Sequence, residues 1–201
     1  MDSVSEAFGH LIYHNFERLK LEFDIGKIVQ GIKDASEGKE SPMDLNECID
    51  KIYSEQKIKQ KIESESNLQK AEAFLESNAH AEGVISLKNR KVQYKVISPG
   101  SGSEIAQHSS PHLRCKVKTL DGEEILGTVR TLVGEELVES GLEETVSLDA
   151  MIEGARLGIL GMKEGEKRII YVHPDLSFKT KQFHFNLPNA LFIFEIEALK
   201  I

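Results

Sequence analysis

The side chains best suited to chemistry in this chain are two cysteines and seven histidines. Cys48 and Cys115 fall in segments that the sequence assigns to different domains, so we expect two reduced thiols and no disulfide. Cys115 lies in a predicted strand, where a cysteine is more often a small core residue than a reactive nucleophile. The histidines lack the spacing that places metal ligands on one helix face. The sequence therefore predicts neither a metal site nor a cofactor.

Phenylalanines near the C-terminus suggest a different kind of site, an apolar groove. The segment from Lys179 to Phe185 alternates basic and aromatic residues, and further phenylalanines lie on either side of it. The groove would be formed by Phe178, Phe183, Phe185 and Phe194. Alternatively, the two phenylalanines inside the segment pack on the edge of the domain.

The stretch from Ser147 to Phe178 precedes the segment with alternating basic and aromatic residues, and it reads as a short helix followed by a strand. Its first part has apolar residues at helical spacing, and the pattern stops at Gly161, which suits a helix end. A polar turn follows, in which Gly165 can take a positive φ. Residues 168–172 then read as a strand, which Pro174 ends because proline cannot donate to a strand ladder.

From Val92 onward the hydrophobic period changes from helical to two. The expected strands are Gln93–Ser98, Leu113–Leu120, Glu123–Gly127, Arg168–His173 and Leu191–Leu199. Together with one short helix, these strands predict an α+β fold in which an antiparallel sheet wraps around the helix.

The N-terminal part is predicted to be all helical. A helix over residues 3–20 has a capping-box spacing at Ser3 and Glu6, and Asp24 caps a second one, Ile25 to Glu37, which Gly38 ends. Asp44 opens a third helix, Leu45 to about Asn78, whose middle is polar nearly all round and reads as an exposed stalk. We expect a helical dimerisation region 1–43, a connecting stalk helix 44–85 and a sheet domain 86–201.

Charge and hydropathy limit the kinds of partner and the location that we expect for the chain. The net charge is −8, and residues 1–85 contain 17 acidic and 10 basic side chains, which argues against nucleic-acid binding there. No apolar run reaches the ~20 residues that a membrane helix requires. The first residues lack the basic start and apolar core of a signal peptide. We therefore expect a cytoplasmic protein, or a periplasmic or surface protein if a signal has been removed.

Several short motifs then occur in an informative order. They are Gln93–Ile97 with Gly100-Ser101-Gly102, Asp121-Gly122, Met162–Glu166, His173–Leu176, Leu187–Ala190 and Leu191–Ile196. From about Lys91 to Ile201 the chain resembles the FKBP-type peptidyl-prolyl isomerases. The helical arm, with Ser77–Ala79 and Glu82–Val84, resembles the macrophage-infectivity-potentiator subgroup, which is usually exported. That resemblance implies a homodimer through the N-terminal helices. A monomer whose helices fold back on the stalk is the alternative.

The resemblance also implies a proline pocket made of aromatic residues, a carboxylate, a tyrosine and one backbone N–H. At the aligned positions the tyrosine is replaced by Cys115, the aromatic after the Asp-Gly hairpin by Ile125 and the aspartate by Leu126. Val146 replaces a phenylalanine, and the pair Met151-Ile152 replaces valine-isoleucine, so the backbone donor of Ile152 can be kept. Ala155 stands for the tryptophan of the pocket floor. Phe178 replaces a tyrosine, and Phe194 is retained.

Two functions follow from this pattern. The first is a peptidyl-prolyl cis-trans isomerase and folding helper with a weakened pocket, in which Ile152, Phe178 and Phe194 act on proline-containing or unfolded clients. The second is a catalytically inactive binding module or chaperone for the same chains. A third hypothesis makes the arm the function, as a dimer that spaces two domains. The acidic segment 134–144 is expected to be a flap over the cleft or a solvated insertion.

Overall fold

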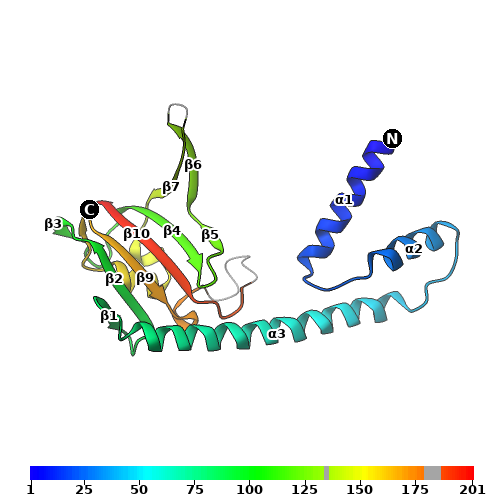
Figure 1. The fold of residues 1–201 in the computed structure, drawn as a ribbon, viewed down its shortest axis with the longest axis horizontal. Helices are drawn as coiled ribbons and strands as arrows, with labels where there is room; N and C mark the ends of the chain where they lie inside the picture. Colours follow the sequence, from blue (N-terminus) through cyan, green and yellow to red (C-terminus); the bar gives the residue numbers. More distant parts are fainter. Residues whose placement is uncertain (134–135, 179–186) are drawn as a thin grey trace. The chain divides into compact units, whose positions relative to one another are not determined.

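The protein was analysed as a computed structural model, which describes residues 1–133, 136–178 and 187–201, and their side chains outside 128–140. The chain divides into two compact units, Met1–Ile62 and Glu63–Ile201. The first unit contains helices, and the second contains the sheet (Figure 1). None of the helices in the described ranges is both long and apolar enough to cross a membrane.

The first unit holds α1 (Asp2–Arg18), α2 (Ile25–Ser36) and the beginning of α3 (Leu45–Asn78). The predicted capping box of the first helix is wrong: α1 already begins at Asp2, after the cap residue Met1, and has no side-chain cap. The second cap is confirmed, because the Asp24 carboxylate accepts a hydrogen bond from the Lys27 N–H at 3.1 Å.

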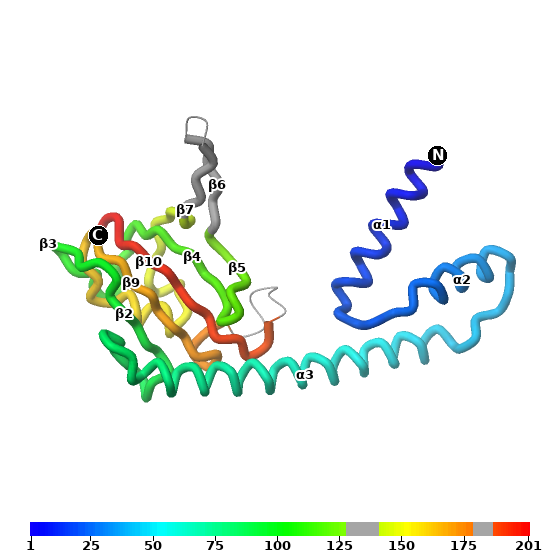
Figure 2. The backbone as a smooth tube through the Cα atoms, viewed as in Figure 1, coloured from blue at the N-terminus to red at the C-terminus, as the bar shows by residue number. Residues whose placement is uncertain are grey.

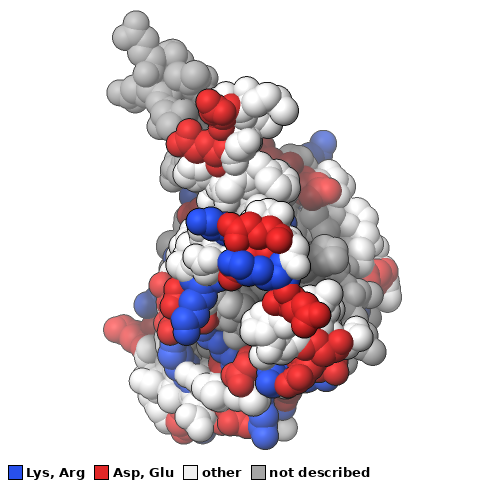
Figure 3. All heavy atoms as spheres, turned by 90° about the vertical axis from the view of Figure 1, so that its right-hand side faces the viewer, with Lys and Arg blue, Asp and Glu red and all other residues white. Residues whose placement is uncertain are grey.

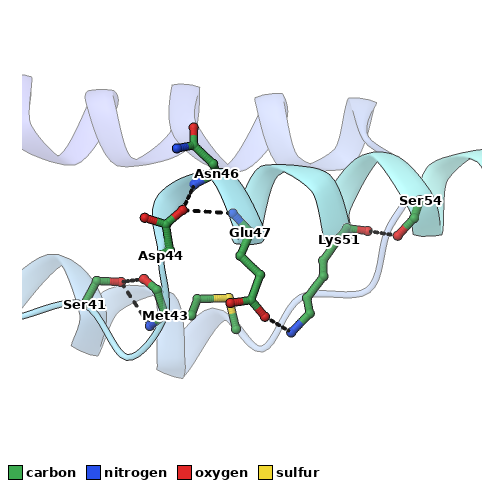
Figure 4. Close-up of polar contacts among 7 residues, drawn as sticks. All are labelled: Ser41, Met43, Asp44, Asn46, Glu47, Lys51 and Ser54. Atoms are coloured by element: carbon green, nitrogen blue, oxygen red, sulfur yellow. Dashed lines mark hydrogen bonds and ion pairs between the residues drawn. The ribbon is translucent and has the colours of Figure 1, made fainter.

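The bounds predicted for α3 are confirmed, and its first turn shows why the helix begins at Leu45 (Figure 4). The Asp44 carboxylate accepts hydrogen bonds from the N–H of Asn46 at 2.8 Å and of Glu47 at 3.2 Å. The Glu47 carboxylate does not complete a capping box; it binds Lys51 Nζ one turn later at 2.7 Å. No Gly or Pro interrupts the 34 residues that follow the cap.

The apolar faces of α1 and α2 are open. Neither helix contains a buried residue. Large apolar side chains remain more than half exposed on both helices, among them Val4, Phe8, Leu11, Val29 and Ile32. Two amphipathic helices without a fully buried residue gain little stability from their own packing.

The second unit is built on one antiparallel sheet (Figure 2). Its strand order is β1-β2-β9-β10-β4-β7-β6, and β5 pairs with β4 beside it. The strands are β1 (Val84–Leu87), β2 (Val92–Ser98), β4 (His112–Thr119), β5 (Glu124–Leu126), β6 (Thr128–Val133), β7 (Glu136–Thr145), β9 (Lys167–Val172) and β10 (Phe192–Lys200). A separate two-stranded ladder joins β3 (Ser101–Glu104) and β8 (Lys163–Glu164).

One face of this sheet is covered by α4 (Glu153–Ile159), which follows a 3-10 turn at Leu148–Ala150. The helix lies very close to the strands, because a Cβ on Gly158 would come within 2.3 Å of Ile170 Cγ2. The main core lies between them and includes Ile159, Phe192 and Ile196. The predicted α+β fold, with an antiparallel sheet around a short helix, is confirmed.

The other face of the sheet is covered by the end of α3. Ala71 and Leu75 pack with Leu191 and Ile193 into a second core cluster. The Gln93 side-chain amide, which is fully buried, donates to the Leu75 carbonyl at 2.7 Å. The last turns of α3 therefore belong physically to the sheet unit. The domain boundaries at 43 and 85 stay a prediction.

The five predicted strands are confirmed to within one or two residues at each end. The hairpin of β6 and β7 was not predicted. Most of the acidic segment expected as a flap or a surface insertion is a strand of the sheet, since β7 pairs with residues His112 to Cys115 of β4. Residues 134–135 lie outside the described part of the chain.

Charges are mixed on the molecular surface. On the face drawn in Figure 3, lysines and arginines lie among aspartates and glutamates, and the described residues form no broad area of one sign there. Exposed charges also pair with near neighbours in the chain, for example Lys51 with Glu47 and Lys39 with Asp34. Exposed pairs of this kind contribute little to stability.

Candidate functional site

An apolar cleft of about 300 Å³ opens on the α4 side of the sheet. Its lining comes from β4, β5, β7, β10 and the chain on either side of the 3-10 turn before α4. The lining residues are Leu113, Cys115, Val117, Leu126, Leu142, Glu144, Val146, Ala150, Met151, Ile152, Phe178 and Phe194. We refer to this set as the apolar cleft. Such a concave apolar surface is the usual form of a binding site.

Strand alternation determines which side chains of β4 reach the cleft. Leu113, Cys115 and Val117 point into it, because alternate residues of a strand share a face. Arg114 and Lys116 line a different cavity, on the opposite face of the sheet. The cleft wall of this strand is therefore free of charge.

Phe178 closes another side of the cleft. Its ring meets Phe192 edge-on, with centroids 5.3 Å apart, and lies 6.3 Å from the Phe194 ring. The preceding 3-10 turn, Pro174–Leu176, holds it in place; there the His173 ring Nδ1 accepts a hydrogen bond from the Asp175 N–H at 3.1 Å. Burial lowers the pKa of His173, so this acceptor stays neutral at pH 7.

Ile152 supplies both a side chain and a backbone donor. Its side chain lines the cleft, and its backbone is extended, with φ −59° and ψ 147°, immediately before α4. Its carbonyl accepts the N–H of Arg156 at 3.1 Å. Within the described residues, the Ile152 N–H has no acceptor. A backbone donor left unpaired beside an apolar surface can bind a carbonyl oxygen.

The structure brings together seven of the eleven residues that the sequence suggested. They are Cys115, Leu126, Val146, Met151, Ile152, Phe178 and Phe194, all lining the cleft. Ile125 and Ala155 are not in the lining; Ala155 is fully buried in the main core, and Ile125 packs against that core. Phe183 and Phe185 lie outside the described residues. The assignment of these residues to a site stays a prediction.

Five lining residues were not suggested by the sequence. Leu113 and Val117 were within reach of sequence reasoning, because each lies two residues from Cys115 on the same predicted strand. Leu142 and Glu144 belong to β7, the strand that was not predicted. Ala150 lies in the 3-10 turn, which has no clear hydrophobic period.

Cys115 behaves as a core residue rather than a nucleophile. Burial, aided by the nearby Glu195 carboxylate, raises the pKa of its thiol to about 12. Both cysteines are free and partly buried. At pH 8 the Cys115 thiol is therefore protonated, and a thiolate is required for alkylation.

We expect Cys115 to resist iodoacetamide at pH 8 in the folded protein and to react in urea. Mass spectrometry of the labelled peptides measures this, and Cys115→Ala, in which Cys48 alone can be labelled, is the control. Because the pKa is raised on folding, this thiol costs no stability below about pH 9 and an increasing amount as the pH rises toward 12. Rapid labelling of Cys115 without urea would contradict the buried geometry.

The described ranges contain no group of three or more His, Cys, Asp or Glu side chains that could hold an ion. The described lining of the cleft offers apolar surface, the Ile152 backbone donor and the Glu144 carboxylate.

Comparisons with known proteins agree with this geometry. A family model described as the domain amino terminal to FKBP-type peptidyl-prolyl isomerase matches residues 1–96. A second, described as FKBP-type peptidyl-prolyl cis-trans isomerase, matches residues 102–199. The second match includes all twelve residues that line the apolar cleft.

Individual relatives cover nearly the whole chain. It is 32% identical to the peptidyl-prolyl cis-trans isomerase Mip of Chlamydia pneumoniae, over 98% of this chain and 72% of the relative. Identity to the Mip isomerase of Chlamydia trachomatis is 29%, over 98% and 77%. The crystal structure of FkpA from Escherichia coli matches the fold with a TM-score of 0.71 at 20% identity, over 98% of this chain and 92% of that one. The chain belongs to the FKBP-type peptidyl-prolyl cis-trans isomerase family.

Proposed function

We propose that the apolar cleft catalyses cis-trans isomerisation of Xaa-Pro bonds in polypeptide clients, and that the protein acts as a folding helper. One observation carries the proposal: an apolar cleft of about 300 Å³ lies beside the Ile152 N–H, which has no acceptor within the described residues. The Mip relatives are named as isomerases of this kind.

The reaction needs little beyond such a cleft. Rotation about the prolyl bond has a barrier of ~18–20 kcal/mol, because the twisted amide loses its resonance. A surface that fits the twisted imide better than the planar one lowers that barrier without a nucleophile or an ion. In this cleft the proline ring would pack against Phe178 and Phe194, and the Ile152 N–H would bind a client carbonyl.

Several polar and aromatic residues that the resemblance implies are replaced here. In the lining, Cys115 and Leu126 stand where the family has a tyrosine and an aspartate, and in the core Ala155 stands where the family has a tryptophan. The thiol at position 115 is protonated and a poor donor, and Leu126 brings no charge. These replacements support a reduced rate. They also favour the second candidate function, a module that binds proline-containing or unfolded chains without converting them.

The N-terminal helices supply a dimer interface in this proposal. The apolar faces of α1 and α2 are open, with Val4 65% and Val29 60% exposed, and the faces of a second copy would cover them. The match of residues 1–96 to the domain that precedes FKBP-type isomerases supports this role. A sedimentation experiment that shows a monomer at micromolar concentration would contradict the proposed dimer.

A location in the periplasm or at the cell surface is proposed rather than the cytoplasm. The resemblance to the macrophage-infectivity-potentiator subgroup implies export, and the relatives named Mip support that subgroup. No comparison supports the cytoplasmic location expected from the first residues. Localisation of the tagged protein by cell fractionation tests this assignment.

The activity is tested with a short Xaa-Pro peptide in an assay that follows cis-to-trans conversion. The protein is expected to convert the peptide, and Leu126→Asp, which returns a carboxylate to the cleft, to convert it several-fold faster. Leu126 is 49% exposed, so the substitution does not disturb the core. Ile97→Asp is the matched control, since Ile97 is 54% exposed and lines the cavity on the opposite face of the sheet.

Three outcomes separate the two candidate functions. Conversion by the unaltered protein establishes the isomerase. Conversion by Leu126→Asp alone means that the fold is intact and that the native cleft is a binder. If neither protein converts the peptide but both bind it, the binding module is the supported function.

A further inference from the structure

Among the twelve described residues that line the apolar cleft, Glu144 is the one with a charged side chain. It lies near the C-terminal end of β7, directly opposite Leu113 of β4, and its side chain is exposed at the mouth of the cleft. We refer to the exposed side chains of Glu144, Leu126 and Leu142 together as the cleft mouth. The exposed fraction is 49% for Leu126 and 36% for Leu142.

The sheet separates Glu144 from the basic residues of the neighbouring strand. Arg114 points to the opposite face, where it binds the carboxylates of Glu143 and Glu197. Lys118 is paired with Glu195, and Lys116 lines the cavity on that same face. The adjacent carboxylates Glu143 and Glu144 thus differ sharply: the first is held by a guanidinium, and the second faces apolar side chains.

No cation pairs with Glu144 within the described residues. A carboxylate exposed at the edge of an apolar surface can attract an approaching cation. The apolar members of the cleft mouth would contact the stem of a long basic side chain, while its charged end reaches the carboxylate.

We propose that Glu144 selects clients that carry a lysine or arginine next to the proline. The inference rests on the proposed function of the cleft and names the substrate class within it. A neutral neighbour would be accepted on the apolar surface alone. An acidic neighbour would be disfavoured, because its charge would be brought close to the like charge of Glu144.

The test uses three peptides, Ala-Xaa-Pro-Phe with Xaa lysine, leucine or glutamate, each carrying a fluorescent label. Both kcat/KM for conversion and the dissociation constant from fluorescence anisotropy are measured on the full chain. We expect the lysine peptide to be favoured over the glutamate peptide by about three- to tenfold in either quantity, the range for a charge pair at a partly exposed site. The preference should shrink in 1 M salt, where the Debye length is about 3 Å.

Variants at positions 144 and 143 test whether the preference among the peptides depends on the charge of Glu144. Glu144→Gln should remove the difference between the lysine and glutamate peptides, and Glu144→Lys should reverse it. Glu143→Gln is the matched control: it changes the next residue of the same strand, whose charge lies on the opposite face with Arg114, and should leave the preference unchanged. A merely structural role for Glu144 would lower activity toward all three peptides equally.

The outcomes distinguish this inference from the proposed function. Conversion of all three peptides at equal rates would overturn the role of Glu144 and leave the isomerase standing. Selective binding of the lysine peptide without conversion of any peptide would support the role of Glu144 and contradict the proposed catalysis. Binding that does not depend on Xaa, or no binding at all, would overturn the inference.

Discussion

Replacement of Ile152 by proline is expected to lower kcat/KM for a prolyl peptide by about 10- to 100-fold, because it removes one hydrogen-bond donor to the client carbonyl. In the described residues this N–H has no acceptor within the protein. The lost interaction is therefore one that a bound client could make and that no described residue of the protein makes. The rate of cis-to-trans conversion, measured under first-order conditions, reports the loss.

The backbone at this position already has the geometry of proline. Ile152 has φ −59°, within the range that the pyrrolidine ring imposes, and the preceding Met151 is extended, with φ −79° and ψ 156°. The carbonyl of Ile152, which accepts the Arg156 N–H, is retained. We therefore expect the circular dichroism spectrum of the variant to match that of the unaltered protein.

Ile152→Ala is the matched control, because it shortens the side chain but keeps the N–H. It should lower kcat/KM less than proline does, although both variants lose part of the apolar lining. Equal losses in the two variants would assign the effect to the side chain. The donor role would then be withdrawn.

Removal of the Glu166 carboxylate should have the largest effect on stability. We expect Glu166→Ala to lower the free energy of unfolding of the sheet unit by about 3–5 kcal/mol, the cost of leaving a buried charge without its partner. Both side chains of the Glu166–Arg168 pair are only 7% exposed. The Arg168 guanidinium would remain inside the unit with no carboxylate beside it.

The pair also connects the sheet to the helix beneath the cleft. Arg168 Nη1 donates to the carbonyls of Gly158 at 2.8 Å and Leu160 at 3.2 Å, which end α4. The guanidinium lies 4.3 Å from the centre of the Tyr94 ring. Glu166 in turn accepts the N–H of Lys163 at 3.0 Å. Loss of the carboxylate therefore weakens the contact that fixes the end of α4.

Hydrogen exchange of the β9 and β10 amides measures this effect within the sheet unit, without assuming that the two units unfold together. Glu104→Ala is the comparison within the same unit, since its pair with Lys163 is exposed and should contribute less than about 1 kcal/mol. The double variant Glu166→Ala with Arg168→Met should recover part of the loss. Equal effects of Glu166→Ala and Glu104→Ala would show that the buried pair is not essential.

The fold was predictable where the sequence contains local signals. The bounds of α3 follow from the Asp44 cap and from a stretch without Gly or Pro, both of which act within a few residues. The strands β2, β4, β9 and β10 carry enough β-branched and aromatic residues to be recognised. The β6–β7 hairpin was missed because β7 is rich in glutamate and is stabilised by pairing with β4, a contact that local propensity does not contain.

The cleft was less predictable than the fold. Cys115, Leu126 and Ile152 were found through a family resemblance, which gives positions but not which side chains converge. Ala155 illustrates the limit, because the packing of α4 on the sheet buries it completely and removes it from the lining. Glu144 could not be found at all, since its place at the cleft depends on the pairing of β7 with β4.

The packing of the last turns of α3 on the sheet affects how such a chain can be divided. If the sheet unit were separated at residue 86, near its first strands, it would lose Ala71 and Leu75 and leave Leu191 and Ile193 uncovered. Gln93 would also lose its partner on the helix. The smallest portion that could be transferred to another protein as a stable domain therefore begins within α3. Recombination at the junction between α3 and β1 would give a sheet unit with exposed apolar side chains and a tendency to aggregate.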